Sequence, residues 1–216
     1  MIAAALMPEY GIMAADSAMY RNDVMEFQTQ KLMRIGDKYL VTVVGASLYL
    51  RRINPHIFMD KIDTVTRYLE EHFLHIQPSV REDLKDSDLK PHFCLYLMGI
   101  DHSVPTLIEF NSFQDFKPKI YRATREIKFT TLFYGDDENK EKQEIFKNTT
   151  GYMEKSIKEY KRVTPGLVGE ILTRGIYHKA DLEMKIGEKR KYAGGVVTVG
   201  MIDKTGKITG LSNLVS

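Results

Sequence analysis

The side chains with the chemistry to act together lie in the amino-terminal part of the chain. Asp16 and Ser17 are adjacent, Lys31 follows, and Thr42 and Ser47 complete the set. A serine or threonine hydroxyl attacks an amide carbonyl when a neighbouring base, here Lys31, accepts its proton. An aspartate beside a lysine also forms ordinary, partly buried ion pairs between strands. The residues by themselves therefore fit either a hydrolytic site with an internal hydroxyl or a structural ion pair.

Metal and cofactor chemistry is not expected. His72 and His75 lie three residues apart, but no cysteine or carboxylate is spaced to complete a tetrahedral set of ligands. The expectation for this pair is a solvated helix end. The single cysteine, Cys94, lies in an apolar run and is expected to be a small buried hydrophobic residue.

Strands must position the first group of residues. The apolar segments 2–7 and 11–15 predict one hairpin, and segment 39–44 with the residues before it predicts another, so four early strands are expected. Later strands are expected at 93–100, 106–110, 119–122, 128–134, 194–202 and 207–211.

Three long helices are expected between these strands. From Ile57 to Ile76 apolar residues recur at three- and four-residue steps, which predicts a helix of about six turns. Residues 78–91 are charged and bounded by prolines, so a loop or short surface helix is expected there. A second helix is expected over 138–160, with a possible break at 148–151. The third begins with Thr164 as cap and Pro165 as first helical residue.

The order of these elements indicates an α+β fold in a single domain, 1–216, because runs of strands and helices are segregated. Two sheets packed face to face, with a helix pair on each outer side, would bury every apolar face as a four-layer αββα sandwich. The 31 basic and 29 acidic residues give a net charge of +2, so no nucleic-acid partner is expected. The chain has no long apolar run and no secretory signal pattern, so no membrane association and a cytoplasmic location are expected.

Four local motifs resemble a known family. Segment 11–17, Gly-Ile-Met-Ala-Ala-Asp-Ser, and segment 30–35, Gln-Lys-Leu-Met-Arg-Ile, are two of them. Segment 44–47 reads Val-Gly-Ala-Ser, and segment 192–197 reads Tyr-Ala-Gly-Gly-Val-Val. In this order the motifs resemble proteasome β subunits and their bacterial ring-forming relatives, the self-compartmentalising N-terminal-nucleophile (Ntn) hydrolases. The resemblance implies the αββα sandwich of that family.

The resemblance also implies roles for three residues. The lysine matching Lys31 places a positive charge beside the nucleophile, and the acid matching Asp16 orients that lysine. The turn matching Gly45 supplies a backbone N–H to the oxyanion. The family further implies a homo-oligomer, as a ring or a smaller assembly, and a possible peptide or protein partner.

Other positions depart from the family. Its nucleophile is an amino-terminal threonine, whereas Met1 falls on the family's second position, carries no acyl-transfer nucleophile and is expected to be retained before Ile2. Arg190 and Ala193 stand where the family has an acid and a serine. A further Gly-Ser-Gly segment corresponds here to 135–137, Gly-Asp-Asp.

These departures predict a catalytically inactive member of the family that acts as a structural, assembly or binding component. Asp16 and Lys31 are then vestigial. The alternative is a peptidase or amidase on the same sandwich that uses Ser17, Thr42 or Ser47 as an internal nucleophile with Lys31.

Overall fold

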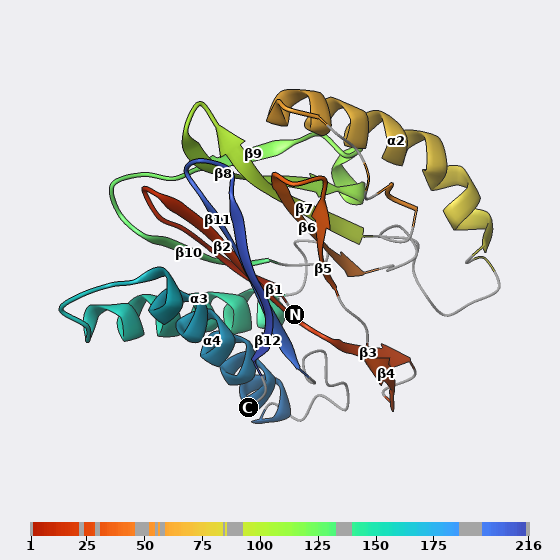
Figure 1. Ribbon diagram of the computed structural model, residues 1–216. Coiled ribbons are helices and arrows are strands. Elements are labelled where there is room, and N and C mark those ends of the chain that lie inside the picture. The colour runs from red at the N-terminus through yellow and green to blue at the C-terminus, as the bar shows by residue number, and fades with distance from the viewer. Residues whose placement is uncertain are drawn as a thin grey trace.

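The protein is α+β, with antiparallel sheets and helices in separate blocks of the chain (Figure 1). The computed structural model describes residues 2–21, 24–28, 31–45, 52–54, 56, 59–83, 85, 93–132, 140–185 and 196–214. Within these ranges the structure confirms the fold class that the segregated strands and helices predict.

The first sheet joins the two ends of the chain. Its strand order is β10-β1-β2-β11-β12. The strands are β1 (Ile2–Leu6), β2 (Tyr10–Asp16), β10 (Lys128–Leu132), β11 (Val197–Asp203) and β12 (Ile208–Leu214). Strand β11 pairs with β2 so that Val197 lies opposite Asp16. The start of β11 therefore lies beside the end of β2.

The second sheet has the strand order β5-β6-β7-β8-β9. Its strands are β5 (Leu32–Ile35), β6 (Tyr39–Gly45), β7 (Phe93–Asp101), β8 (Val104–Asn111) and β9 (Lys119–Arg122). A short 3₁₀ helix, η1 (Ser112–Gln114), separates β8 from β9. In the register between β5 and β6, Leu32 lies opposite Thr42. This register places Lys31 and Gly45 at the same end of the sheet.

A further hairpin was not predicted from the sequence. Strands β3 (Ala18–Arg21) and β4 (Val24–Gln28) pair with each other in a separate two-stranded sheet between β2 and β5. The four early strands that the sequence predicts are present as β1, β2, β5 and β6, and β3 and β4 are two more within the described residues up to Gly45. These two further strands are short, and the alternation of apolar and polar residues covers only Met25 to Gln28 within segment 18–28.

Apolar side chains form three layers across the molecule. One lies between the two sheets and contains Met13, Leu40, Tyr96, Met98 and Leu107 among its members. A second lies between the outer face of the β5–β9 sheet and helix α2 (Ile62–Asp83). The third lies between the outer face of the other sheet and helices α3 (Lys140–Lys158) and α4 (Pro165–Lys185). Figure 1 shows α2 on one side of the strands and α3 and α4 on the opposite side.

Two glycines allow large side chains of one sheet to approach the backbone of the other. A Cβ atom at Gly11 would lie 2.6 Å from the sulfur of Met98. At Gly200 it would lie 3.0 Å and 3.1 Å from methyl groups of Leu40 and Leu32. Such separations are shorter than ordinary contacts between carbon atoms, so any side chain there would displace a neighbour.

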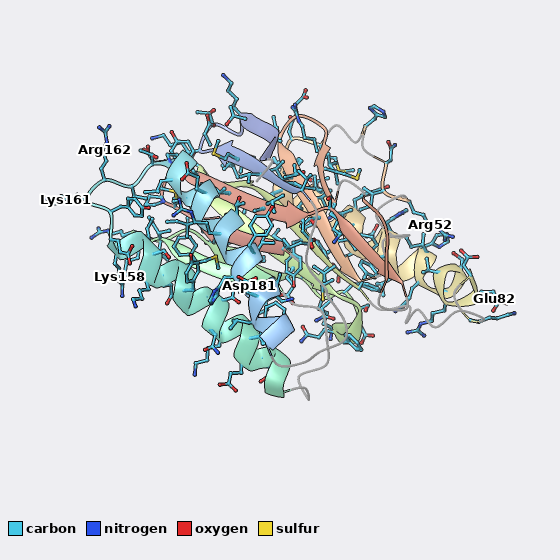
Figure 2. All side chains as sticks on the ribbon, turned by 90° about the horizontal axis from the view of Figure 1, so that it is seen from below. Arg52, Glu82, Lys158, Lys161, Arg162 and Asp181 are labelled. Atoms are coloured by element: carbon cyan, nitrogen blue, oxygen red, sulfur yellow. The ribbon has the colours of Figure 1, made fainter. Side chains whose placement is uncertain are left out.

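Helix α2 extends further than the sequence predicts. Residues 78–83 were expected to form a loop or short surface helix, but they are the last turns of α2, with Pro78 inside the helix. Proline removes one backbone hydrogen bond, but tertiary contacts hold this end. Arg52 donates to Ser79 Oγ at 2.5 Å and pairs with Asp83, while Val80 is fully buried. Figure 2 shows Arg52 beside this end of the helix.

Helices α3 and α4 form an antiparallel pair. The possible break at 148–151 does not occur, because α3 is continuous to Lys158. The cap predicted for α4 is present: the backbone N–H of Leu167 donates to Thr164 Oγ1 at 3.2 Å. Figure 2 shows Lys158, Lys161 and Arg162 projecting from the turn between the two helices. None of the described helices is long and apolar enough to cross a bilayer.

Candidate functional site

Asp16 and Lys31 form an ion pair that connects the two sheets. Asp16 is the last residue of β2, and Lys31 immediately precedes β5. The ammonium group of Lys31 donates a hydrogen bond of 2.6 Å to Asp16 Oδ1. The carboxylate is fully buried, and 13% of the lysine side chain is exposed. The structure thus brings together the acid and the lysine that the sequence singles out.

The surroundings of Asp16 favour its ionised form. Burial alone raises the pKa of a carboxyl group, because it removes the charged form from water. Neighbouring positive charge, including the ammonium group of Lys31, has the larger effect, so the pKa of Asp16 lies below its ordinary value of 3.8. Asp16 is therefore a carboxylate at neutral pH, and its contact with Lys31 satisfies the usual requirement that a buried charge be compensated.

Ser17 lies next to this pair and connects two distant segments of the chain. Its side chain is nearly buried, and its Oγ accepts a hydrogen bond of 2.9 Å from the backbone N–H of Val196. This bond holds the start of β11 against the end of β2. The ammonium group of Lys31 is directed to the neighbouring carboxylate of Asp16.

The hydroxyl of Thr42 is not brought to the pair. Thr42 is fully buried in β6 and shares its face of the sheet with residues of the layer between the sheets, such as Leu40. Among the described residues its Oγ1 has no hydrogen-bond partner. A substrate has no access to this hydroxyl without separation of the sheets. Ser47 lies outside the described residues.

Gly45 is the last residue of β6 and lies opposite Phe93 of β7. Its φ angle is 100°, a value that glycine adopts readily and residues with a Cβ adopt rarely. The residue is exposed, at the end of the sheet where Lys31 lies. The backbone at Gly45 therefore has a conformation that favours glycine, while the turn that the motif predicts and its oxyanion role stay predictions.

Several positions on which the resemblance depends lie outside the described residues. These are Met1, the 135–137 segment, Arg190 and Ala193. Their departures from the family are features of the sequence alone.

A polar cluster between the sheets was not anticipated. Tyr121 Oη donates to Glu109 Oε2 at 2.8 Å, and Tyr96 hydrogen-bonds Cys94 on the neighbouring part of the layer. Burial raises the pKa of Cys94 to about 12, so its thiol is unreactive at neutral pH. The two-residue spacing of Cys94 and Tyr96 in a strand places them on one face, and this spacing is the signal that sequence reasoning could have used.

The histidines and the surface hollows lie apart from the ion pair. The ring of His72 stacks on Tyr68 and contacts the carbonyl oxygen of Arg52 at 3.1 Å. Burial lowers the pKa of His72, so its neutral form is favoured. A shallow hollow on α3 is lined by Lys147, Asn148, Thr150, Gly151, Tyr152, Glu154 and Lys155. Comparison with protein-family models and with curated protein sequences finds no match to this chain.

Proposed function

We propose that this protein is a catalytically inactive relative of proteasome β subunits, with the αββα sandwich of the Ntn hydrolases, and that it acts as a structural, assembly or binding component. The layered arrangement of helices and two sheets supports the sandwich. The four motifs of the sequence support the family, and three of their residues, Asp16, Lys31 and Gly45, lie at the ends of strands.

The observation that carries the loss of catalysis is the sequence at the family's site positions, where Met1 provides no acyl-transfer nucleophile. The bond of 2.6 Å between Lys31 and the buried carboxylate of Asp16 is the one that the resemblance implies, so it supports the family and does not by itself separate an active member from an inactive one. Ser17 accepts a backbone hydrogen bond, and Thr42 is sealed between the sheets. Arg190 and Ala193 further replace the family's acid and serine in the sequence. The retained pair then has a structural function.

A covalent probe tests this proposal. The purified protein is treated with a hydroxyl-directed electrophile, such as a β-lactone or a fluorophosphonate, and its intact mass is measured. We expect no stoichiometric adduct and no hydrolysis of fluorogenic peptides. An active proteasome treated in parallel is the positive control. An adduct that forms on the wild-type chain and is lost in Lys31→Ala would overturn the proposal.

The assembly part has its own test. Family resemblance leads us to propose a homo-oligomer, either a ring or a smaller assembly. Native mass spectrometry over a range of protein concentrations should detect species above the 24.9 kDa chain. Detection of monomer alone at every concentration would remove the oligomer from the proposal and leave the binding role.

The adjacency of Ser17 to the ion pair favours one alternative, a peptidase or amidase that uses an internal hydroxyl with Lys31. Ser17 is the candidate that the geometry favours, because Thr42 is inaccessible. If the alternative holds, the covalent adduct maps to Ser17 and disappears in Ser17→Ala. Thr42→Val is the matched control, since it removes a hydroxyl that a probe does not reach. Ser47→Ala tests the remaining candidate.

A further inference from the structure

Strand β9 is the last strand of its sheet in the described part of the chain. It pairs with β8 through Thr106 opposite Arg122 and Glu109 opposite Lys119. In an antiparallel pair, alternate residues direct their N–H and C=O groups toward the neighbouring strand, and the others direct theirs away. The outer side of β9 therefore presents backbone donors and acceptors in the spacing that an added strand requires.

Basic residues are concentrated along this edge. Between positions 117 and 128 the sequence Lys-Pro-Lys-Ile-Tyr-Arg-Ala-Thr-Arg-Glu-Ile-Lys contains five basic residues and one acidic residue. We name four of them the basic rim: Lys117, Lys119, Arg122 and Arg125. The fifth, Lys128, is the first residue of β10 in the other sheet. All five are exposed. The whole chain has a net charge of only +2, so this segment is a local concentration of positive charge.

The residues of the rim are not equivalent. Arg122 donates through Nε and Nη2 to Asp101 Oδ2, at 3.1 Å and 2.8 Å, so much of its charge is compensated within the chain. Lys119 lies over the ring of Tyr121, with its nitrogen 5.3 Å from the ring centre. Lys117 and Arg125 flank the strand at its two ends. They are the charges that a partner lying along β9 would meet first.

Two exposed apolar side chains lie close to this edge in the sequence. Ile120 is 43% exposed in the middle of β9, and Phe113 is 43% exposed in η1. Ile120 lies opposite Ile108, so it is on the face of the sheet toward α2. Large exposed apolar residues beside a strand edge provide contacts for alternate side chains of an added strand.

We propose that β9 and the basic rim form a docking edge for an extended acidic peptide segment of a partner protein, which adds to the sheet as a strand. Backbone hydrogen bonds along β9 give the alignment, carboxylates face the rim, and apolar side chains contact Ile120. A second copy of this chain is disfavoured as the occupant, because antiparallel pairing of two β9 strands would bring like charges together. A nucleic acid would use the charge but not the backbone edge or Ile120.

This inference names a partner class for the binding role proposed above and rests on that role. It does not depend on whether the Asp16–Lys31 region is catalytic. The covalent-probe experiment and the peptide-binding experiment therefore fail independently, so the two proposals remain distinguishable.

Fluorescence anisotropy with defined peptides tests the docking edge. The probe is a labelled short peptide that alternates glutamate and valine. The comparison ligands are a lysine–valine peptide, a glutamate–proline peptide that lacks half of the backbone donors, and oligothymidine. We expect the glutamate–valine peptide to bind about tenfold or more tightly than each of these. Binding should weaken when the salt concentration rises from about 50 mM to about 500 mM.

Charge-reversal variants locate the binding. Lys117→Glu combined with Arg125→Glu should weaken binding of the glutamate–valine peptide by about tenfold or more. Lys158→Glu combined with Lys161→Glu makes the same change in net charge at the α3–α4 turn, and it should change affinity by less than about twofold. Circular dichroism shows whether each variant is folded. Because the peptide comparison needs no variant, it stands if the rim variant fails to fold.

Three results would overturn the proposal. One is the absence of glutamate–valine binding, and another is equal binding of the glutamate–proline peptide or of oligothymidine, which would indicate recognition of charge alone. The third is equal loss of affinity in the two double variants, which would place the binding elsewhere on the protein.

Discussion

The hydroxyl oxygen of Ser17 accepts a hydrogen bond from the backbone N–H of Val196, a residue 179 positions further along the chain. The bond joins the end of β2 to the residue that precedes β11. It lies directly beside the buried Asp16–Lys31 pair. Two interactions therefore connect the segments in which the resemblance places catalytic residues: the bond between Val196 and Ser17, and the ion pair between Lys31 and Asp16.

Ser17→Ala removes this link while leaving the backbone unchanged. The loss of a buried hydrogen bond should lower the free energy of unfolding by about 1–2 kcal/mol. Hydrogen exchange should accelerate at the amide of Val196 more than at amides in the middle of β11. An unchanged exchange rate at Val196 would contradict the assigned bond.

Lys31→Met leaves the buried carboxylate of Asp16 without its lysine. The free energy of unfolding should fall by about 1.5–3 kcal/mol, the usual contribution of a hydrogen bond to a charged group, because other positive charge near the carboxylate remains. Adding Asp16→Asn to this variant should restore part of the loss. The control is Lys38→Met, because Lys38 pairs with Asp60 at 2.6 Å but both side chains are exposed. That variant should cost no more than about 1 kcal/mol in urea denaturation.

The pH dependence of stability should reveal the same carboxyl group. The pKa of Asp16 is lower in the folded protein than its ordinary value of 3.8. Its contribution to stability is therefore complete above that value and is lost as the pH falls through the folded-state pKa. The difference in free energy of unfolding between wild type and Asp16→Asn should shrink as the pH decreases from about 6 to about 3. A difference that stays constant would show that the carboxylate is not stabilised by folding.

Two helical glycines should respond oppositely to alanine. Gly151 in α3 is exposed, and an added Cβ meets no atom within 4 Å. Gly151→Ala should therefore stabilise the protein by up to about 1 kcal/mol through helix propensity. At Gly175 in α4 the Cβ would lie 2.6 Å from the sulfur of Met153. Gly175→Ala should destabilise the protein by about 1–3 kcal/mol, because the two helices are closely packed there. Thermal unfolding of both variants measures this difference.

Thr42→Val tests whether the buried hydroxyl has a function. The hydroxyl has no hydrogen-bond partner among the described residues, and valine has nearly the same shape. Its replacement should leave the free energy of unfolding unchanged or raise it by about 1 kcal/mol. A loss above about 1 kcal/mol would show that the hydroxyl has a partner that stabilises the fold.

Regular local patterns made much of the fold predictable. The apolar runs predicted the β1–β2 and β7–β8 hairpins to within a few residues, and Thr164 with Pro165 marked the start of α4. Tertiary contacts decided the elements that the sequence misplaced. Arg52 and the burial of Val80 hold the last turns of α2 despite Pro78. In the short β3–β4 hairpin, apolar and polar residues alternate only over Met25 to Gln28.

The candidate site was predictable only where a motif marked it. Asp16 and Lys31 were paired through family resemblance, and the structure places them 2.6 Å apart. The bond between Ser17 and Val196 links positions with no pattern in common, so only the pairing of β2 with β11 reveals it. The sealed position of Thr42 likewise depends on the packing of one sheet on the other.

Asp16 ends a strand of one sheet, and Lys31 precedes a strand of the other. The distance between their charged groups therefore depends on the relative position of the two sheets. Met98 occupies the space above Gly11, and Leu32 and Leu40 occupy the space above Gly200. A slide of one sheet by a single residue, about 3.4 Å, would drive these side chains into neighbouring residues. Gly11 and Gly200 therefore fix the relative position of the two sheets. A larger side chain at either position should weaken the Asp16–Lys31 ion pair, although neither glycine contacts that pair.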